Sequence, residues 1–332
     1  MIARFEWSNA RSIDDALGQL NEKSMVKAGG IDLMDRLKEG LDAPSRLVNI
    51  RTIAGLDYVK EESGWLRLGP MVTLAKIAGH PLIRRRYAVL ADAALKAATP
   101  QIRNAATVGG NLLQRPRCWY FRSGEFHCLR KGGGRCFAQD GENEYHAIFD
   151  NEICAIVHPS AAACALTALD AKVEVKGKKG TREIALNDLF VRPETDFTRE
   201  HALHPGELLT EIRVPAPSDA TRSAYTKVGQ KESFDWPLAE VAVVLELRGS
   251  AKSTMSLQVS KASIVLGAAA PVPWRATAAE KALAGKPLNE QSAREAAAAA
   301  VKGATPLSGN AYKVPIFEAV VRRTLLAAWG PG

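Results

Sequence analysis

One stretch of the sequence combines two β-branched residues, a glycine pair and an asparagine: Thr107-Val108-Gly109-Gly110-Asn111-Leu112. A related stretch, Lys27-Ala28-Gly29-Gly30-Ile31-Asp32-Leu33, follows a predicted strand over 24–28. A glycine pair after a strand is often only a tight turn, but it can also point successive backbone N–H groups at one anion. Two such turns in one lobe predict a grip on the two phosphates of a dinucleotide. Neither matches G-x-G-x-x-G or G-x-x-x-x-G-K-S/T, so a Rossmann fingerprint and a P-loop are excluded.

The N-terminal two thirds of the chain alternate short strands with helical segments. Residues 1–54 are predicted to form a small α/β lobe in which Ser12 caps the first helix, and a second lobe follows over 55–218. Within the second lobe we predict one long helix over 81–98, because a proline suits the first turn of a helix. We also predict an edge strand at 206–215.

The C-terminal part, residues 219–332, begins after a turn-rich stretch and is predicted to be a separate α/β domain. Three antiparallel strands are expected first, and helices follow them. The predicted strands are 223–229, 238–247 and 254–267, and the predicted helices are 276–284, 289–302 and 313–328.

Composition limits the classes of function. The chain has 332 residues, of which 46% are apolar and 24% charged, as is ordinary for a globular protein of two or three domains. The net charge of +8 is spread along the chain, so we do not expect a nucleic-acid interface. We expect no membrane span and no signal peptide at Met1–Trp7. The protein is therefore expected to be cytoplasmic, or periplasmic by export with a partner that carries the signal.

Four of the five cysteines fall within one glycine-rich, basic segment, 114–155, that lacks apolar periodicity. They are Cys118, Cys128, Cys136 and Cys154. Their spacing lacks the close pairs typical of structural zinc, and the expected reducing compartment disfavours disulfides. An iron–sulfur cluster needs four thiolates but no close pairs, and nearby cations would favour thiolates and offset the cluster's negative charge. The neighbouring cations are Arg115, Arg117, Arg122, Arg130, Lys131 and Arg135. An iron–sulfur cluster is thus favoured, with zinc or empty thiols as the alternatives.

The other reactive side chains are expected to be structural. Cys164 lies on a predicted buried helix that begins at Pro159-Ser160, where a thiol behaves as a small apolar group. The sequence offers no Ser-His-Asp order and no paired carboxylates that we would assign to an active site. We therefore predict no catalytic residue in this chain.

Several strings of the sequence resemble one known family. They are Ala28-Gly29-Gly30-Ile31-Asp32-Leu33, Gln101-Ile102-Arg103-Asn104-Ala105-Ala106-Thr107-Val108-Gly109-Gly110-Asn111-Leu112 and Val157-His158-Pro159-Ser160. Together they resemble the FAD-binding medium subunit of the molybdenum hydroxylases, a family that includes the xanthine dehydrogenase, carbon monoxide dehydrogenase and aldehyde oxidoreductase flavoproteins. The run 265–275 is similar to that family's closing domain, so the resemblance covers nearly the whole chain in the family's order.

This resemblance implies an α+β fold and a set of cofactor residues. The fold is a two-lobed, vanillyl-alcohol-oxidase-like (PCMH-type) FAD-binding unit, followed by a C-terminal three-stranded sheet with helices. The pyrophosphate of FAD would be held by Met25, Val26, Lys27, Ala28, Gly29, Gly30, Ile31, Asp32 and Leu33. The second lobe would contribute Thr107, Gly110 and Asn111, and Lys227 would lie along the flavin.

Two positions depart from the family pattern. Ala161 stands where the family has an aspartate that contacts FAD, and Ile31 stands where a threonine is common. The cysteine segment, in contrast, matches a subset of the family in both order and position. That subset is similar to the periplasmic aldehyde oxidoreductase and 4-hydroxybenzoyl-CoA reductase flavoproteins, whose inserted loop carries a 4Fe–4S cluster. The resemblance thus implies that Cys118, Cys128, Cys136 and Cys154 ligate such a cluster.

The function implied is that of an electron-transfer subunit. A large molybdenum-cofactor partner would oxidise the substrate, which we expect to be an aldehyde. A small 2Fe–2S partner would pass the electrons to FAD here, and an external acceptor would remove them. The assembly would be a heterotrimer or a multiple of it. Two alternatives remain open: a self-sufficient FAD-dependent oxidase, and a zinc-stabilised scaffold protein without a redox role.

Overall fold

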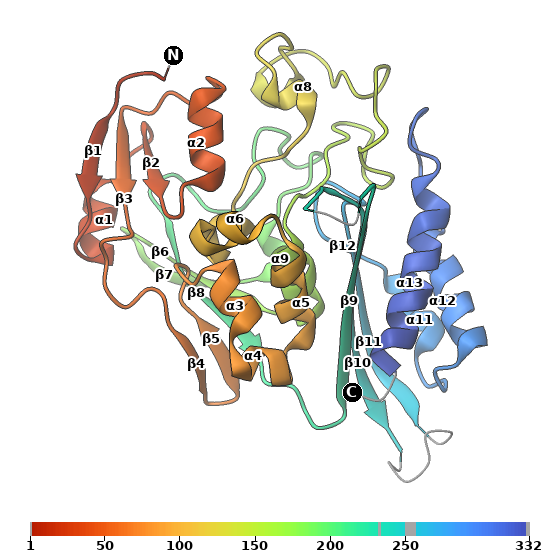
Figure 1. Ribbon diagram of the computed structural model, residues 1–332. Coiled ribbons are helices and arrows are strands. Elements are labelled where there is room, and N and C mark those ends of the chain that lie inside the picture. The colour runs from red at the N-terminus through yellow and green to blue at the C-terminus, as the bar shows by residue number, and fades with distance from the viewer. Residues whose placement is uncertain (1, 232–233, 250–256, 330–332) are drawn as a thin grey trace. The chain divides into compact units, whose positions relative to one another are not determined.

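The computed structural model describes residues 2–231, 234–249 and 257–329, and it separates into two compact units that interleave along the chain (Figure 1). Unit 1 comprises Met1–Lys76, Thr99–Arg135 and Asp170–Ala216, and unit 2 comprises Ile77–Ala98, Cys136–Leu169 and Pro217–Gly332. The predicted division into three parts at residues 54 and 218 remains a prediction, because each of the two compact units combines segments from different parts of the chain. The expected α+β class is confirmed.

A small parallel sheet begins unit 1. Its strands are β1 (Glu6–Asn9), β2 (Ser24–Lys27) and β3 (Arg46–Asn49), in the order β1-β3-β2. Helix α1 (Ile13–Gln19) connects β1 to β2, and helix α2 (Ile31–Lys38) connects β2 to β3. Ser12 caps α1 as predicted, because its hydroxyl accepts a hydrogen bond from the amide of Asp15 at 3.0 Å. The two helical connections between parallel strands, with the buried β3 at the centre of the sheet, give this lobe its α/β form.

A five-stranded antiparallel sheet forms the rest of the framework of unit 1. Its order is β4-β5-β8-β6-β7, so β8 (Leu208–Pro215) lies in the middle and the prediction of an edge strand at 206–215 is wrong. The only proline of β8 is its last residue, where a missing N–H removes no interior hydrogen bond, and most of its side chains are buried. The flanking strands are β4 (Val59–Glu62), β5 (Trp65–Leu68), β6 (Lys172–Gly177) and β7 (Gly180–Ala185).

Short helices fill the remaining parts of unit 1. Helices α6 (Pro100–Ala105) and α7 (Val108–Leu112) carry the second glycine motif, and α8 (Trp119–Arg122) and the 3-10 helix η1 (Leu129–Lys131) lie in the cysteine segment. The helix α10 (Leu186–Leu189) follows β7. In helix α3 (Leu74–Gly79), with Thr73 at its start, the chain passes from unit 1 to unit 2 for the first time.

Unit 2 is built on an antiparallel sheet of order β12-β11-β10-β9. Its three long strands match the predicted ones, except that the start of the third prediction, residues 254–256, lies outside the described residues. The strands are β9 (Thr221–Gly229), β10 (Pro237–Arg248), β11 (Gln258–Gly267) and the short β12 (Trp274–Arg275). The helices α11 (Thr277–Leu283), α12 (Glu290–Val301) and α13 (Lys313–Trp329) follow, close to the predicted ranges.

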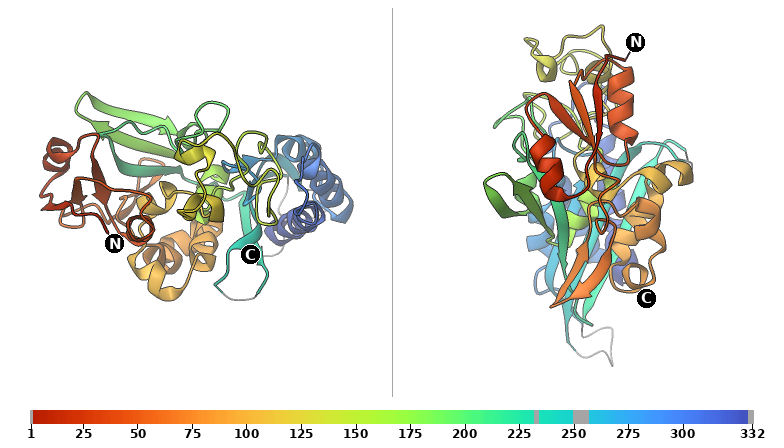
Figure 2. Two further views of the ribbon diagram at one scale, coloured as in Figure 1. Left: turned by 90° about the horizontal axis from the view of Figure 1, so that it is seen from above. Right: turned by 90° about the vertical axis from the view of Figure 1, so that its left-hand side faces the viewer.

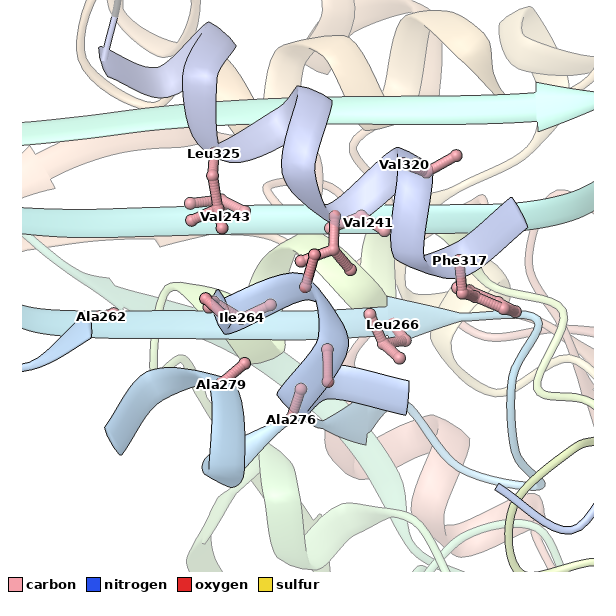
Figure 3. Close-up of a cluster of buried hydrophobic side chains, with 14 of the residues drawn as sticks. Val241, Val243, Ala262, Ile264, Leu266, Ala276, Ala279, Phe317, Val320 and Leu325 are labelled. Carbon is pink, nitrogen blue, oxygen red and sulfur yellow. The ribbon is translucent and has the colours of Figure 1, made fainter. Parts of the chain in front are cut away.

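The sheet of unit 2 is covered on both faces. The helices α11, α12 and α13 gather on one face, as the view from above in Figure 2 shows. Figure 3 shows the core beneath them, where Val241 and Val243 of β10 meet Val320 and Leu325 of α13. The opposite face packs against α5 (Ala88–Lys96) and α9 (Ala161–Ala168), and every residue of α9 is buried. Because both faces are covered, β10 is an almost continuous apolar run.

The single helix predicted over 81–98 is wrong. Tyr87 interrupts it with φ −130° and ψ 48°, and separates α4 (Pro81–Arg86) from α5. The Tyr87 side chain is fully buried, so tertiary packing fixes the break although no proline or glycine marks it. In the described part of the chain, no helix combines the length and the apolar character that crossing a bilayer requires.

Candidate functional site: two glycine motifs and a cysteine segment

The first glycine motif leaves a helix N-terminus uncapped. Strand β2 ends at Lys27, and Gly30 adopts φ +88° as the N-cap residue of α2, a conformation that favours glycine. No side chain caps this helix. The amides of Ile31, Asp32 and Leu33 belong to the first turn, where helical geometry provides no acceptor. These amides and the positive end of the helix dipole suit an anion, and the binding of a phosphate at this turn remains a prediction.

The first glycine motif lies in close backbone contact with the end of α6, just before the second motif. A Cβ atom at Gly29 would lie 2.2 Å from the carbonyl oxygen of Ala105 and 3.3 Å from the Cα atom of Ala106. Only glycine can allow such an approach. Ala105 ends α6, two residues before Thr107. Within unit 1, the structure therefore brings together the turn after β2 and the start of the second motif.

The second motif differs from the first, because its amides are already satisfied. It folds as the short helix α7, and the N–H of Val108 donates to the carbonyl of Val72 at 2.8 Å while that of Gly109 donates to Pro70 at 3.0 Å. The amide of Gly110 donates to the Thr107 hydroxyl oxygen at 3.2 Å. The expectation that Gly109-Gly110 offers an anion nest is therefore wrong. The groups of this motif that suit a ligand are the side chains of Thr107 and Asn111.

Asp32 is the centre of an ionic cluster. Its carboxylate lies 2.6 Å from Nη2 of Arg122, 3.0 Å from Nη2 of Arg117 and 3.4 Å from Nε of Arg36, and it accepts the backbone N–H of Arg115 at 3.1 Å. Burial alone would raise the pKa of Asp32, but the three guanidinium groups outweigh it and hold the pKa below its usual value. The carboxylate of Asp32 is thus paired with arginines, so Asp32 would contact a phosphate through its backbone amide.

The cysteine segment is divided between the two units. Cys118 precedes α8, and the buried Cys128 precedes η1, both in unit 1. Cys136 and the buried Cys154 belong to unit 2. None of the five cysteines forms a disulfide. Among the residues that the structure describes, no three His, Cys, Asp or Glu side chains are grouped so as to hold a metal ion.

The arginines of the cysteine segment are mostly paired with carboxylates, which the sequence could not indicate. Glu200 accepts hydrogen bonds from Arg115 at 3.0 Å and from Arg130 at 2.8 Å. Arg122 also pairs with Glu39 at 3.1 Å. The expected cationic field around the thiols is therefore largely neutralised, and its ion pairs instead fasten this segment to α2 and to residues 199–200.

Lys227 lies on β9 in unit 2. Its Nζ atom donates to the carbonyl oxygens of Asp235 at 2.6 Å and Lys96 at 3.1 Å. Burial lowers the pKa of Lys227, and the carboxyl of Glu240, its partner residue in β10, acts in the opposite direction. Ala161 is the first residue of α9, and the hydroxyl of Ser160 caps that helix by accepting the amide of Ala163 at 2.9 Å.

A buried polar network in unit 2 escaped the sequence analysis. Lys313 is fully buried, and its Nζ atom donates to the carbonyl oxygens of Ala268 at 2.6 Å and His146 at 2.9 Å. The Asn310 side chain donates to the same His146 carbonyl at 3.1 Å. The Asn151 side chain donates to the carbonyl of Thr305 at 2.7 Å. These bonds attach the segment before Cys154 to the start of α13, and only the position of Lys313 within an apolar helix hinted at them.

Two family models account for nearly the entire chain. The model described as the FAD binding domain in molybdopterin dehydrogenase matches residues 3–217, and that described as the CO dehydrogenase flavoprotein C-terminal domain matches residues 223–328. The aldehyde oxidoreductase FAD-binding subunit PaoB of Escherichia coli (strain K12) is 34% identical over 305 residues, which are 91% of this chain and 90% of that protein. The carbon monoxide dehydrogenase medium chain of Hydrogenophaga pseudoflava is 28% identical, with 98% of this chain and 97% of that one covered.

Solved structures agree with the sequence comparisons. A chain of carbon monoxide dehydrogenase from Hydrogenophaga pseudoflava, in the form that lacks the Mo-pyranopterin moiety of the molybdenum cofactor, superposes with a TM-score of 0.76 at 29% identity. The superposition covers 99% of this chain and 98% of that chain. A chain of quinoline 2-oxidoreductase from Pseudomonas putida 86 reaches a TM-score of 0.75 at 22% identity, which is a likeness of fold.

Proposed function

The chain belongs to the family of FAD-binding subunits of molybdopterin dehydrogenases, and from this premise we propose that it is the electron-transfer flavoprotein subunit of a multi-subunit molybdenum hydroxylase. The observation that carries the proposal is the contact of Gly29 with Ala105. That contact sets the open first turn of α2 beside the start of the second glycine motif, within one unit.

FAD fits this arrangement through its pyrophosphate. The segment Met25–Leu33 would hold the phosphates, with the amides of Ile31, Asp32 and Leu33 donating to their oxygens. The Thr107 hydroxyl and the Asn111 side chain would hold the cofactor from the neighbouring motif, and the exposed Gly110, which has no side chain, would allow it to approach closely. Bound FAD supplies the two-electron redox chemistry, and the protein supplies binding, orientation and electrostatics.

Lys227 is proposed to lie along the flavin of the bound cofactor. Its ammonium group donates to two carbonyl oxygens, which fix its position. A fixed cation at that place would stabilise the negative charge of a reduced flavin. Lys227 would thereby favour the reduced form of the cofactor.

The partners and the substrate follow from the relatives. We propose a large partner with the molybdenum cofactor, which oxidises the substrate, and a small 2Fe–2S partner, which delivers electrons to this subunit. Identity of 34% with the FAD-binding subunit of an aldehyde oxidoreductase supports an aldehyde as the substrate of the complex. The assembly would be a heterotrimer or a multiple of it.

We further propose that Cys118, Cys128, Cys136 and Cys154 hold a 4Fe–4S cluster. The donor set suits iron, because four thiolates are what such a cluster takes. Cys118 and Cys128 belong to unit 1 and Cys136 and Cys154 to unit 2, and the described residues contain no group of three such ligands around one metal-ion position. Arg130, two residues after Cys128 in the sequence, has buried Nε and Nη2 atoms that reach no acceptor among the described residues.

The test is a visible spectrum of the purified subunit with FAD and iron quantified per chain. We expect one FAD and about four iron atoms, the number in a cubane cluster. In a Cys128→Ser variant, iron should be lost while FAD remains. Cys164→Ala is the matched control, because Cys164 is buried on α9 and should leave both contents unchanged.

Each outcome bears on a different part of the proposal. A subunit without FAD would overturn the flavoprotein function, even if iron were present. FAD without iron, or one zinc per chain, would overturn only the cluster. Iron retained in Cys128→Ser would show that the ligand set is wrong.

A further inference from the structure

Lys27, the last residue of strand β2, carries a charge without a counter-ion. Among the described residues, its ammonium group forms neither a hydrogen bond nor an ion pair. The ammonium nitrogen lies 5.7 Å from the centre of the exposed Trp7 ring. That ring is held in place, because its Nε1–H donates to the side chain of Asn9 at 3.0 Å. The face of an indole attracts a cation but does not neutralise its charge, so Lys27 remains able to bind an anion.

The side chain of Lys27 also reaches the uncapped start of helix α2. A Cβ atom at Gly30, the N-cap residue, would lie 3.1 Å from the Cε atom of Lys27. The ammonium nitrogen is bonded to that carbon, so the cation lies beside the first turn of α2. The proposed position of the FAD phosphates is at this same turn, whose amides have no acceptor within the helix. Both the backbone and a side chain therefore present positive charge at one place in unit 1.

Arg51 brings a second cation to the same end of the parallel sheet. It follows strand β3, where the N–H of Ile50 donates to the carbonyl oxygen of Lys27 at 3.1 Å and joins the two strand ends. The exposed guanidinium group of Arg51 forms no hydrogen bond or ion pair with any residue that the structure describes. Burial lowers the pKa of Lys27, and the positive charge of Arg51 lowers it further. The two cations repel each other, and an anion bound between them would relieve that repulsion.

We propose that the side chains of Lys27 and Arg51 bind the two phosphates of FAD, and that Lys27 leaves the Trp7 ring to do so. This inference rests on the proposed FAD-binding function. It adds two side-chain cations to the backbone amides of α2, and a diphosphate carries enough negative charge to pair with both. The Trp7 ring holds Lys27 within reach until the ligand arrives. Lys27 and Arg51 therefore determine specificity, because they favour a flavin with two phosphates over a flavin with one or none.

The first experiment measures the binding of ADP and of adenosine to the FAD-free subunit by calorimetry. ADP carries the diphosphate of FAD without the flavin, and adenosine carries no phosphate. In Lys27→Met and in Arg51→Met we expect ADP to bind at least about tenfold more weakly than in the wild type, and the affinity for adenosine to stay the same.

Lys60→Met is the matched control for Lys27→Met. The ammonium group of Lys60, on strand β4 of unit 1, lies 5.1 Å from the centre of the Tyr58 ring, so this variant also removes a lysine from an aromatic face. Its affinity for ADP should equal that of the wild type. Equal losses in Lys27→Met and Lys60→Met, or unchanged ADP binding in Lys27→Met, would overturn the inference.

A second measurement keeps Lys27 in place and so does not depend on how Lys27→Met folds. Wild-type subunit without FAD is labelled with ¹⁵N-tryptophan, and its indole signals are followed by NMR, with Trp7→Phe used to identify the signal of Trp7. ADP should shift this signal, because the ammonium group leaves the ring, whereas adenosine should not. A signal that ADP leaves in place, or that adenosine shifts equally, would overturn the inference.

The two proposals fail in different ways. A wild-type subunit that binds neither FAD nor ADP would overturn the flavoprotein function itself. Wild-type subunit that binds FAD, together with unchanged FAD and ADP affinities in Lys27→Met and Arg51→Met, would leave that function standing and overturn only the role of the two cations.

Discussion

The carboxylate of Asp32 accepts a 2.6 Å hydrogen bond from Nη2 of Arg122, while the backbone of Asp32 lies in the uncapped first turn of α2. One residue therefore belongs both to the proposed phosphate-binding turn and to the cluster that fastens the cysteine segment. Through Asp32, the position of α8 and the position of the α2 N-terminus are coupled within unit 1.

Replacing Asp32 by Asn should loosen this coupling. The substitution removes the negative charge that is shared by Arg36, Arg117 and Arg122 and leaves their buried charges without it. Breaking a buried ionic group costs roughly 3–5 kcal/mol, so we expect a loss of about 3 kcal/mol in the free energy of unfolding. Chemical denaturation measures this loss, and protein-bound FAD should fall with it.

Asp35→Asn is the matched control for Asp32→Asn. Asp35 lies on the same helix and pairs with Arg117 at 3.4 Å, but its side chain is 46% exposed. Exposed ion pairs contribute about 0–1 kcal/mol, so the control should change stability little. If the two variants lost the same stability, the Asp32 cluster would not hold the segment in place.

A methyl group at position 29 should separate the two glycine motifs. In Gly29→Ala the new Cβ would lie 2.2 Å from the Ala105 carbonyl oxygen, and no side-chain rotation can relieve this clash because the backbone fixes the position of both atoms. We expect FAD to bind at least about tenfold more weakly, equivalent to about 1.4 kcal/mol or more. Fluorescence titration of the apoprotein with FAD measures this change.

The control for Gly29→Ala is the same chemical change at Gly18, in α1. A Cβ at Gly18 meets nothing within 4 Å, so alanine fits and should stabilise the helix by up to about 1 kcal/mol. FAD affinity in Gly18→Ala should equal that of the wild type. Wild-type affinity in Gly29→Ala as well would show that the close contact does not shape the site.

Features decided by neighbouring residues could be predicted from the sequence. Ser12 caps its helix as expected, and the helix expected to begin at Pro159-Ser160 begins at Ala161 with Ser160 as its cap, since a cap depends on a hydroxyl and an amide a few residues apart. The strand–Gly29-Gly30–helix unit also followed from local pattern, because Gly30 has the positive φ that glycine permits. The family's motifs then supplied the fold that these local units build.

Features decided by distant residues were predicted wrongly or not at all. The place of β8 at the centre of its sheet depends on which strands pair with it, and the break at Tyr87 depends on packing. The sequence shows many arginines near the cysteines but not that Glu200 neutralises Arg115 and Arg130. The amides of the second glycine motif seemed open because their acceptors, such as the Pro70 carbonyl, lie in another segment.

Removing the cation of Lys227 should change the relative affinity for the two forms of the flavin. In Lys227→Met, reduced FAD should bind about tenfold more weakly relative to oxidised FAD, because a unit charge at several ångströms contributes on the order of 1–3 kcal/mol inside a protein. The shift in the midpoint potential of the bound flavin reports this ratio. Arg222→Met, an exposed cation on the same strand, should leave the potential unchanged, and an equal shift in both variants would contradict a specific role for Lys227.

The buried Lys313 predicts how stability depends on pH. Burial lowers the pKa of Lys313 to about 7, below its ordinary value of 10.5 in the unfolded chain. Between these pH values the unfolded chain holds a proton that the folded protein lacks, so raising the pH favours folding. Relative to Lys313→Met, the wild type should gain up to about 4 kcal/mol in the free energy of unfolding from pH 7 to pH 10. Denaturant titrations across this range measure the difference. The control is Lys302→Met at an exposed site, relative to which the wild type should show no such gain. If the difference between the wild type and Lys313→Met did not change with pH, Lys313 would stay charged in the folded protein.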